Sequence, residues 1–139
     1  MKRLIIPLFS FLLISCGSGG SDPGSGDKPT KEDISNALHK QNDLPGDNFT
    51  PRHDVEIHEI KIGDTEGTNE QDKIDGIPAK AAVTMAKVDF TERAYYTDKT
   101  TTRRREITAK VFKDDFGDWK VMTDASREIS GADEPAQPK

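Results

Sequence analysis

The stretch that decides the fold is AKVDFTERAYYTDKTTTRRREITAKV, residues 86–111, which has the pattern of two strands joined by a turn. In each half, apolar residues recur at every second position, the period of a strand with one buried face. A two-residue turn at Asp98-Lys99 would set four cross-strand pairs: Ala86–Val111, Val88–Ala109, Phe90–Ile107 and Glu92–Arg105. Because apolar residues then meet apolar ones and the charged pair has opposite signs, we expect an antiparallel hairpin from about residue 81 to residue 112.

A further strand is expected after this hairpin. Residues 114–118, DDFGD, have turn-forming composition, with Gly117 available for a positive φ. The segment 119–123 then returns as a strand that places Val121 opposite Val111 and Trp119 near Lys113 at the end of the sheet. The polar residues 131–139 are expected to be a disordered tail.

Upstream of the hairpin the pattern predicts a helix and one more strand. Thr30 and Asp33 form an approximate capping box for a helix of about three turns. One narrow stripe of this helix faces the core, formed by Ile34, Ala37, Leu38 and Gln41. Residues 55–62 alternate as a strand whose apolar positions change parity, so we expect a bulge near His58. The polar segment 63–78 is expected to be an exposed connection.

The fold expected from these elements is α+β, with one N-terminal helix packed on an antiparallel sheet of about four strands, in a single domain spanning residues 30–130. Its order of elements resembles the cystatin-like and nuclear-transport-factor-like α+β modules of small bacterial lipoproteins. That resemblance implies a helix packed across a curved sheet. It transfers no function, because these modules serve many functions.

The first sixteen residues have the pattern of a leader. Lys2 and Arg3 precede an apolar run that ends at Leu13-Ile14-Ser15-Cys16, and the run is shorter than the ~20 residues that span a bilayer. The end of this run resembles the lipobox of bacterial lipoproteins. The resemblance implies a signal peptide at residues 1–15, cleavage after Ser15, and lipidation of Cys16, with outer-membrane residence facing the periplasm the favoured location. Residues 16–29, rich in Gly and Ser, are expected to be a flexible linker.

Composition restricts the classes of partner. The chain has 32% hydrophobic residues, a formal net charge of −5 and a single cysteine. An acidic chain is poorly suited to bind nucleic acid, and with Cys16 lipidated no disulfide can form. We therefore expect a small core, no cofactor, and a partner that is another envelope protein.

Three side-chain groups are candidates for function. Asp54, Glu56 and His58 share one strand face next to His53 and could converge on a metal ion, although a solvated strand face is the favoured interpretation and the sequence assigns no metal site. Arg103, Arg104 and Arg105 could form a basic patch, but alternation sends Arg104 to the other face, which favours an ordinary charged surface. The aromatic residues Tyr95, Tyr96, Phe116 and Trp119 could either contact a partner or seal the ends of the sheet.

The function that these patterns favour is a non-enzymatic, lipid-anchored module that binds another protein through its sheet or hairpin edges. An envelope or secretion-system component, or an inhibitor of an incoming toxin, would fit. The alternative is a carrier that holds a small molecule or a metal in a pocket between helix and sheet. An enzyme is not expected, because we find no Gly-x-Ser-x-Gly motif and no evident Ser-His-acid spacing.

Overall fold

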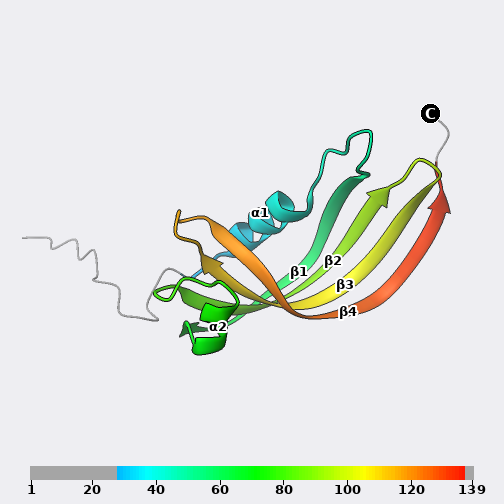
Figure 1. The fold of residues 1–139 in the computed structure, drawn as a ribbon. Coiled ribbons are helices and arrows are strands. Elements are labelled where there is room, and N and C mark those ends of the chain that lie inside the picture. Colours follow the sequence, from blue (N-terminus) through cyan, green and yellow to red (C-terminus); the bar gives the residue numbers. More distant parts are fainter. Residues whose placement is uncertain (1–27, 137–139) are drawn as a thin grey trace, which may run out of the picture.

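The computed structural model describes residues 28–136, which form an open four-stranded antiparallel sheet with strand order β1-β2-β3-β4 (Figure 1). The elements in chain order are α1 (Lys31–Asn42), β1 (Arg52–Gly67), α2 (Glu70–Ile74), β2 (Ala82–Tyr95), β3 (Lys99–Lys113) and β4 (Trp119–Pro135). The α+β class is therefore confirmed. The predictions for the signal peptide, for Cys16 and for the linker up to residue 27 lie outside the described residues. No helix within residues 28–136 is both long enough and apolar enough to cross a membrane.

The central hairpin of β2 and β3 forms, but its register differs by two residues from the one expected. Ala86 pairs with Ala109, Val88 with Ile107, Phe90 with Arg105 and Glu92 with Arg103. The backbone N–H of Tyr96 donates to the carbonyl of Lys99 at 2.8 Å, so the turn residues are Thr97 and Asp98 rather than Asp98 and Lys99. Because side chains alternate with a period of two, this shift changes partners and leaves every side chain on its expected face.

Strand β4 confirms the predicted pairing at its start and extends further than expected at its end. Val121 pairs with Val111, and Trp119 with Lys113. The strand then continues to Pro135, which pairs with Lys99, so the expectation of a disordered tail from Gly131 is wrong as far as Pro135. Beyond Val121, strand β4 has no buried apolar residue. This part of the strand is held by its backbone hydrogen bonds to β3 and by the ion pair between Arg103 and Asp133, with 2.8 Å between nitrogen and oxygen.

Strand β1 contains the predicted bulge, because the register shifts between Ile57 and Glu59 and leaves His58 unpaired with β2. The expectation of an exposed connection from residue 63 to residue 78 is wrong, however. Strand β1 continues through a second register shift to Gly67, and α2 follows. Short α2 is stabilised by a capping box in which Asn69 and Asp72 bond to each other's backbone N–H groups.

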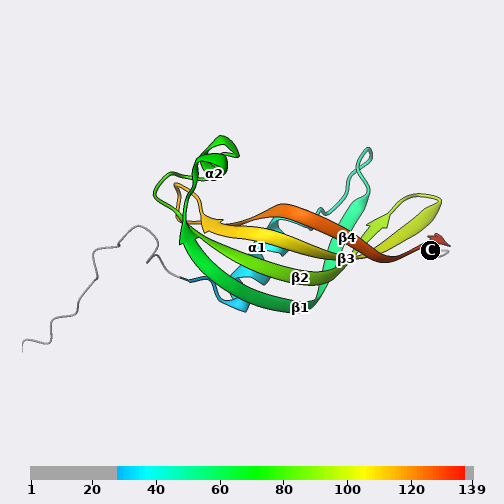
Figure 2. The same ribbon diagram turned by 90° about the horizontal axis from the view of Figure 1, so that it is seen from below.

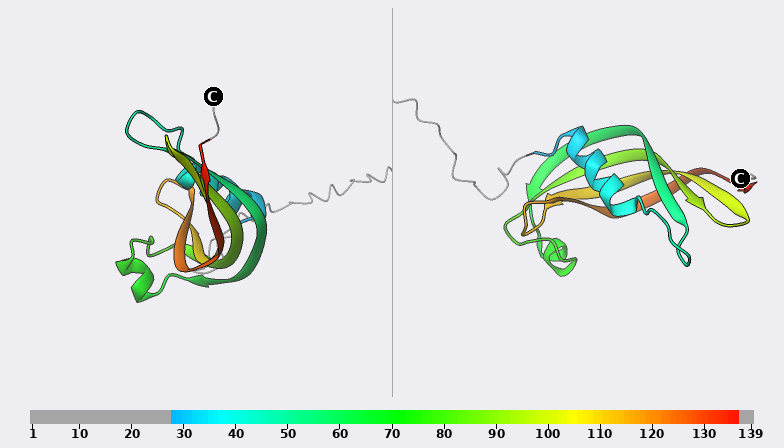
Figure 3. Two further views of the ribbon diagram at one scale, coloured as in Figure 1. Left: turned by 90° about the vertical axis from the view of Figure 1, so that its right-hand side faces the viewer. Right: turned by 90° about the horizontal axis from the view of Figure 1, so that it is seen from above.

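Helix α1 lies across the concave face of the curved sheet (Figures 1 and 3). Thr30 and Asp33 form its capping box as predicted. Ile34, Ala37 and Leu38 are each at most 5% exposed and pack on the apolar face of the sheet. That face contributes the remaining buried residues of the main core: Val55, Ile60, Ala86, Val88, Phe90, Ile107, Ala109, Val111 and Val121.

A second, smaller core lies on the opposite face of the sheet, where the segment carrying α2 packs at one end (Figure 2). Ile77, Val83 and Phe112 are buried there, with Met122 half-buried beside them. At this end the sheet is therefore covered on both faces. The other half of the sheet, which carries the β2–β3 turn and the end of β4, projects beyond α1 (Figure 1).

Candidate functional site

Three aromatic side chains at the projecting end of the sheet form what we call the aromatic tip: Phe49 and Tyr96, which are exposed, and Tyr95, which is half-buried. Phe49 is 96% exposed and Tyr96 is 43% exposed. These residues surround a hollow of about 350 Å³ between the α1–β1 loop and the β2–β3 turn. The sequence identified the two tyrosines and missed Phe49, because the turn-forming residues around it give no periodic signal.

The loop that carries Phe49 is held by its own hydrogen bonds. One carboxylate oxygen of Asp47 accepts from the backbone N–H groups of Phe49, at 2.8 Å, and Thr50, at 2.7 Å. These bonds, that of Phe49 foremost, lower the pKa of Asp47. Gly46 has a φ of 75°, and a Cβ there would lie 2.8 Å from the backbone nitrogen of Arg52, so a glycine is required. Phe49 is therefore presented to solvent by an ordered turn.

Cations flank both tyrosines of the tip. The guanidinium carbon of Arg52 lies 4.8 Å from the centre of the Tyr95 ring, and the Lys99 ammonium lies 6.0 Å from the Tyr96 ring. Burial, followed by a hydrogen bond to Asp54, raises the pKa of the Tyr95 hydroxyl. The tip thus combines apolar rings with a cationic rim.

The other two aromatic residues named from the sequence do not join the tip. Phe116, which is 91% exposed, and Trp119 lie at the opposite end of the sheet, at the β3–β4 turn. Trp119 packs against the main core, and the Lys113 ammonium lies 4.9 Å from its ring. Trp119 therefore closes the end of the sheet, whereas Phe116 is exposed.

The carboxylates of the candidate metal cluster are engaged with an arginine instead. Glu56 receives a 2.7 Å hydrogen bond from Arg93, which also lies 3.9 Å from Asp54. The Arg93 guanidinium lowers the pKa of Glu56. His58 bonds to the hydroxyl of Thr91 at 2.6 Å. In the part of the chain that the structure describes, no group of three His, Cys, Asp or Glu residues has a geometry that could hold a metal ion.

The three consecutive arginines are also paired, and they lie on two faces of the sheet as predicted. Arg104 donates two hydrogen bonds, at 2.9 and 2.7 Å, to the carboxylate of Asp89. Arg103 bonds to Asp133 at 2.8 Å, and Arg105 lies 3.9 Å from Glu92. These contacts favour an ordinary charged surface over a basic recognition patch.

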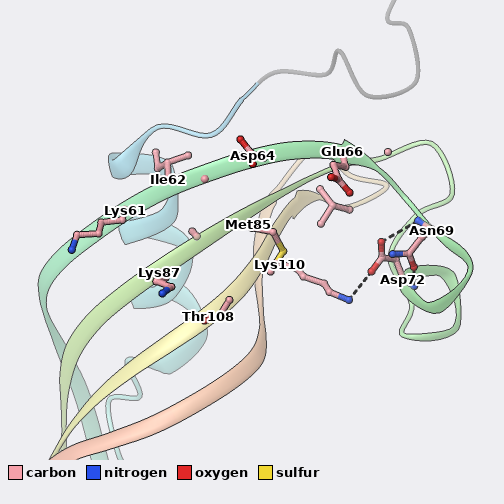
Figure 4. A pocket seen from close by; sticks show the side chains of 14 residues that line it. Lys61, Ile62, Asp64, Glu66, Asn69, Asp72, Met85, Lys87, Thr108 and Lys110 are labelled. Atoms are coloured by element: carbon pink, nitrogen blue, oxygen red, sulfur yellow. Dashed lines mark hydrogen bonds and ion pairs between the residues drawn. The ribbon is translucent and has the colours of Figure 1, made fainter.

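A second hollow lies on the face of the sheet opposite α1, beneath α2 (Figure 4). It has a volume of about 410 Å³, and the apolar side chains on its floor are those of Val83 and Met85. The alternative function expected from the sequence is a carrier with a pocket between the N-terminal helix, α1, and the sheet. This cavity lies beside α2, an element that the sequence analysis did not predict.

One wall of this cavity contains a nearly buried ion pair. The Lys110 ammonium lies 2.7 Å from a carboxylate oxygen of Asp72, and their side chains are 15% and 3% exposed. The hydrogen bond from Lys110, followed by the backbone N–H of Asn69, lowers the pKa of Asp72. This pair joins α2 to β3 and closes the cavity on the α2 side (Figure 4).

Comparisons with protein-family models, with curated proteins and with solved structures find no match to this chain.

Proposed function

We propose that this chain is a lipid-anchored, non-enzymatic protein of the bacterial cell envelope that binds another protein through its aromatic tip. The observation that carries the proposal is Phe49, an almost fully exposed aromatic side chain on an ordered loop beside Tyr96. Aromatic residues at the centre of an interface supply a large share of its binding energy. A loop that is already ordered loses little conformational entropy when a partner binds.

The position of the tip supports this proposal. The described chain enters the domain at Lys28, and the tip lies at the opposite end of the sheet (Figure 1). Lipid on Cys16, followed by a Gly/Ser-rich linker with a span of roughly 20 Å, would hold the domain near the bilayer. The tip would then be the part that can extend furthest from the membrane towards a partner.

The hairpin end is favoured over the sheet edge as the binding surface. Strand β4 has an open edge, and a partner strand could add to such an edge. However, its pairing with β3 contains two register shifts, and its outer half carries exposed charged residues such as Arg127 and Glu134. Bulges and charges are the features by which proteins prevent edge pairing.

The tip is tested by affinity capture from solubilised cell envelopes with wild-type protein, Phe49→Ala and Phe116→Ala. The control removes an equally exposed phenylalanine at the opposite end of the sheet. We expect wild type and Phe116→Ala to recover the same stoichiometric protein and Phe49→Ala to lose it. Recovery of that protein by Phe49→Ala would show that the tip is not the binding site. If wild type recovers no protein in stoichiometric amount, the proposed protein-binding function is refuted.

The anchor is tested separately by mass spectrometry and membrane fractionation of wild type and Cys16→Ala. We expect only wild type to carry the mass of a diacylglyceryl group and acyl chain and to sediment with membranes, since two or three acyl chains anchor a domain stably. A variant that remains membrane-bound with an unchanged processed mass, apart from the substituted side chain, would contradict the lipobox interpretation.

A further inference from the structure

We infer that the cavity beneath α2 is a binding site for a small amphiphile with one carboxylate, such as a free medium-chain fatty acid. This site is separate from the aromatic tip and adds a ligand-binding function to the proposed protein-binding one. The cavity volume of about 410 Å³ falls in the range of roughly 300–1,000 Å³ that encloses small ligands. Its floor is apolar, as an alkyl chain requires.

The floor is built by the outward-facing residues of β2 and the adjoining part of β1. Val83 is 6% exposed and anchors the smaller core, and Met85 is half-buried beside it. Gly63 of β1 lets the two strands approach here, because a Cβ at this position would lie 3.0 Å from the carbonyl oxygen of Met85. Methionine is a flexible, polarisable side chain that adapts to apolar ligands of different shape.

A pair of lysines defines the end of the cavity remote from α2 (Figure 4). Lys61 and Lys87 are directly opposite each other in the β1–β2 ladder. Like charges at such positions repel each other across a Cβ separation of roughly 5 Å. Lys61 lies 3.4 Å from Glu59, whereas within residues 28–136 no carboxylate lies within 4.0 Å of the Lys87 ammonium. A ligand carboxylate would relieve this repulsion and pair with Lys87.

The acidic residues of the cavity set the direction in which the ligand lies. Asp72 is already engaged by Lys110, and Glu66 lines the end nearer α2. Glu66 pairs with Val83, four residues along β2 from Lys87, so the acidic and cationic ends are separated by about 13 Å. The carboxylate head therefore belongs beside Lys61 and Lys87, with the chain lying over Met85 towards Val83.

The proposal is tested by titrating octanoate into a chain of residues 17–139, which contains every element of the described fold, and following amide chemical shifts. Octanoate stays monomeric at the concentrations needed. Octylammonium serves as the probe of opposite charge, and circular dichroism confirms that each protein is folded. We expect saturable 1:1 binding of octanoate, with the largest shifts at Lys61, Met85 and Lys87, and at least tenfold weaker binding of octylammonium.

Two lysine variants with the same change of charge separate a specific site from general electrostatic attraction. Lys87→Gln is expected to weaken octanoate binding about tenfold. Lys40→Gln, which removes a lysine of α1 on the opposite face, is expected to leave it unchanged. The inference is overturned if octanoate does not saturate, if octylammonium binds as tightly as octanoate, or if both variants bind octanoate like wild type. Loss of binding here would leave the aromatic tip and its partner unaffected.

Discussion

A single glutamine side chain bonds the end of α1 to the backbone of the edge strand β4, and its substitution gives a sharp test of the fold. The Gln41 amide nitrogen donates to the carbonyl of Val121 at 2.9 Å, and its amide oxygen accepts from the N–H of Val121 at 2.8 Å. Both backbone groups of Val121 therefore face away from β3 and are paired by Gln41. The side chain acts as a short neighbouring strand at the start of β4.

Removing the amide should cost less than two full hydrogen bonds. An intramolecular hydrogen bond contributes about 0.5–1.5 kcal/mol net. Because Gln41 is partly exposed, water can bond to the Val121 backbone groups in place of the missing amide. We therefore expect Gln41→Ala to lower the free energy of unfolding by about 1 kcal/mol. For a domain of this size such a loss lowers Tm by about 5 °C. Equilibrium urea unfolding followed by the fluorescence of Trp119, the only tryptophan, measures the change.

The substitution Gln41→Glu distinguishes this paired contact from simple loss of packing. A carboxylate can accept from the Val121 N–H but cannot donate to its carbonyl, which would face a second oxygen. We expect this variant to be about 2 kcal/mol less stable than wild type at pH 7, because a polar group is left unpaired beside a charge.

The pH dependence of the glutamate variant provides the control. The neighbouring carbonyl raises the folded-state pKa of the introduced carboxyl above its unfolded value of about 4.3. The loss of stability caused by the charged carboxylate is therefore present above the folded-state pKa. It disappears as the pH falls towards 4, where the protonated carboxyl can donate a hydrogen bond to the Val121 carbonyl. The stability difference between the Glu and Ala variants should shrink over this range. A glutamate variant as stable as the alanine variant at pH 7 would refute the paired geometry.

Two further predictions concern the core and the charged face. Ile34 of α1 is fully buried against the sheet, so Ile34→Ala should lower the free energy of unfolding by about 3 kcal/mol, whereas Ile34→Val should lower it by about 1 kcal/mol. Equal losses in urea unfolding would contradict this packing. The hydrogen bond from Arg104 lowers the pKa of Asp89, so this carboxylate stabilises the fold above pH ~4, and the stabilisation is lost as the pH falls through the folded-state value. Thermal melts should show that Tm falls less for Asp89→Asn than for wild type when the pH is lowered below about 4. If Tm falls equally with pH in the two proteins, Arg104 does not stabilise the fold through the Asp89 carboxylate.

The faces of the central hairpin could be predicted from the sequence, whereas its register could not. Apolar residues at alternate positions place Val88 and Ile107 on the buried face in either register, because a shift of two residues preserves the face. The register depends on which two residues form the turn. Thr97-Asp98 and Asp98-Lys99 are both polar pairs without glycine, so local composition does not distinguish them.

The ends of β1 and β4 escaped prediction because their stability does not come from buried apolar residues. Beyond Val121, all but one of the residues of β4 are exposed, and the strand is held by its ladder with β3 and by pairs such as Arg103 with Asp133. Such a segment has the composition of a tail. Only a partner strand elsewhere in the chain makes it a strand, and that information is not local.

Helix α2 and its cavity show the same limit at the candidate ligand site. Five helical residues are too few to give a periodic signal, and isolated helices of this length are not stable in water. The helix is stabilised by the Asp72 side chain, which accepts from the backbone N–H of Asn69 and also from Lys110, 38 positions away in the sequence. Because that bond also joins α2 to β3 at the cavity wall, one non-local ion pair contributes both to the helix and to the cavity. The capping residues Asn69 and Asp72 are close in the sequence, whereas the position of α2 on the sheet depends on Lys110 of β3, which is distant in the sequence.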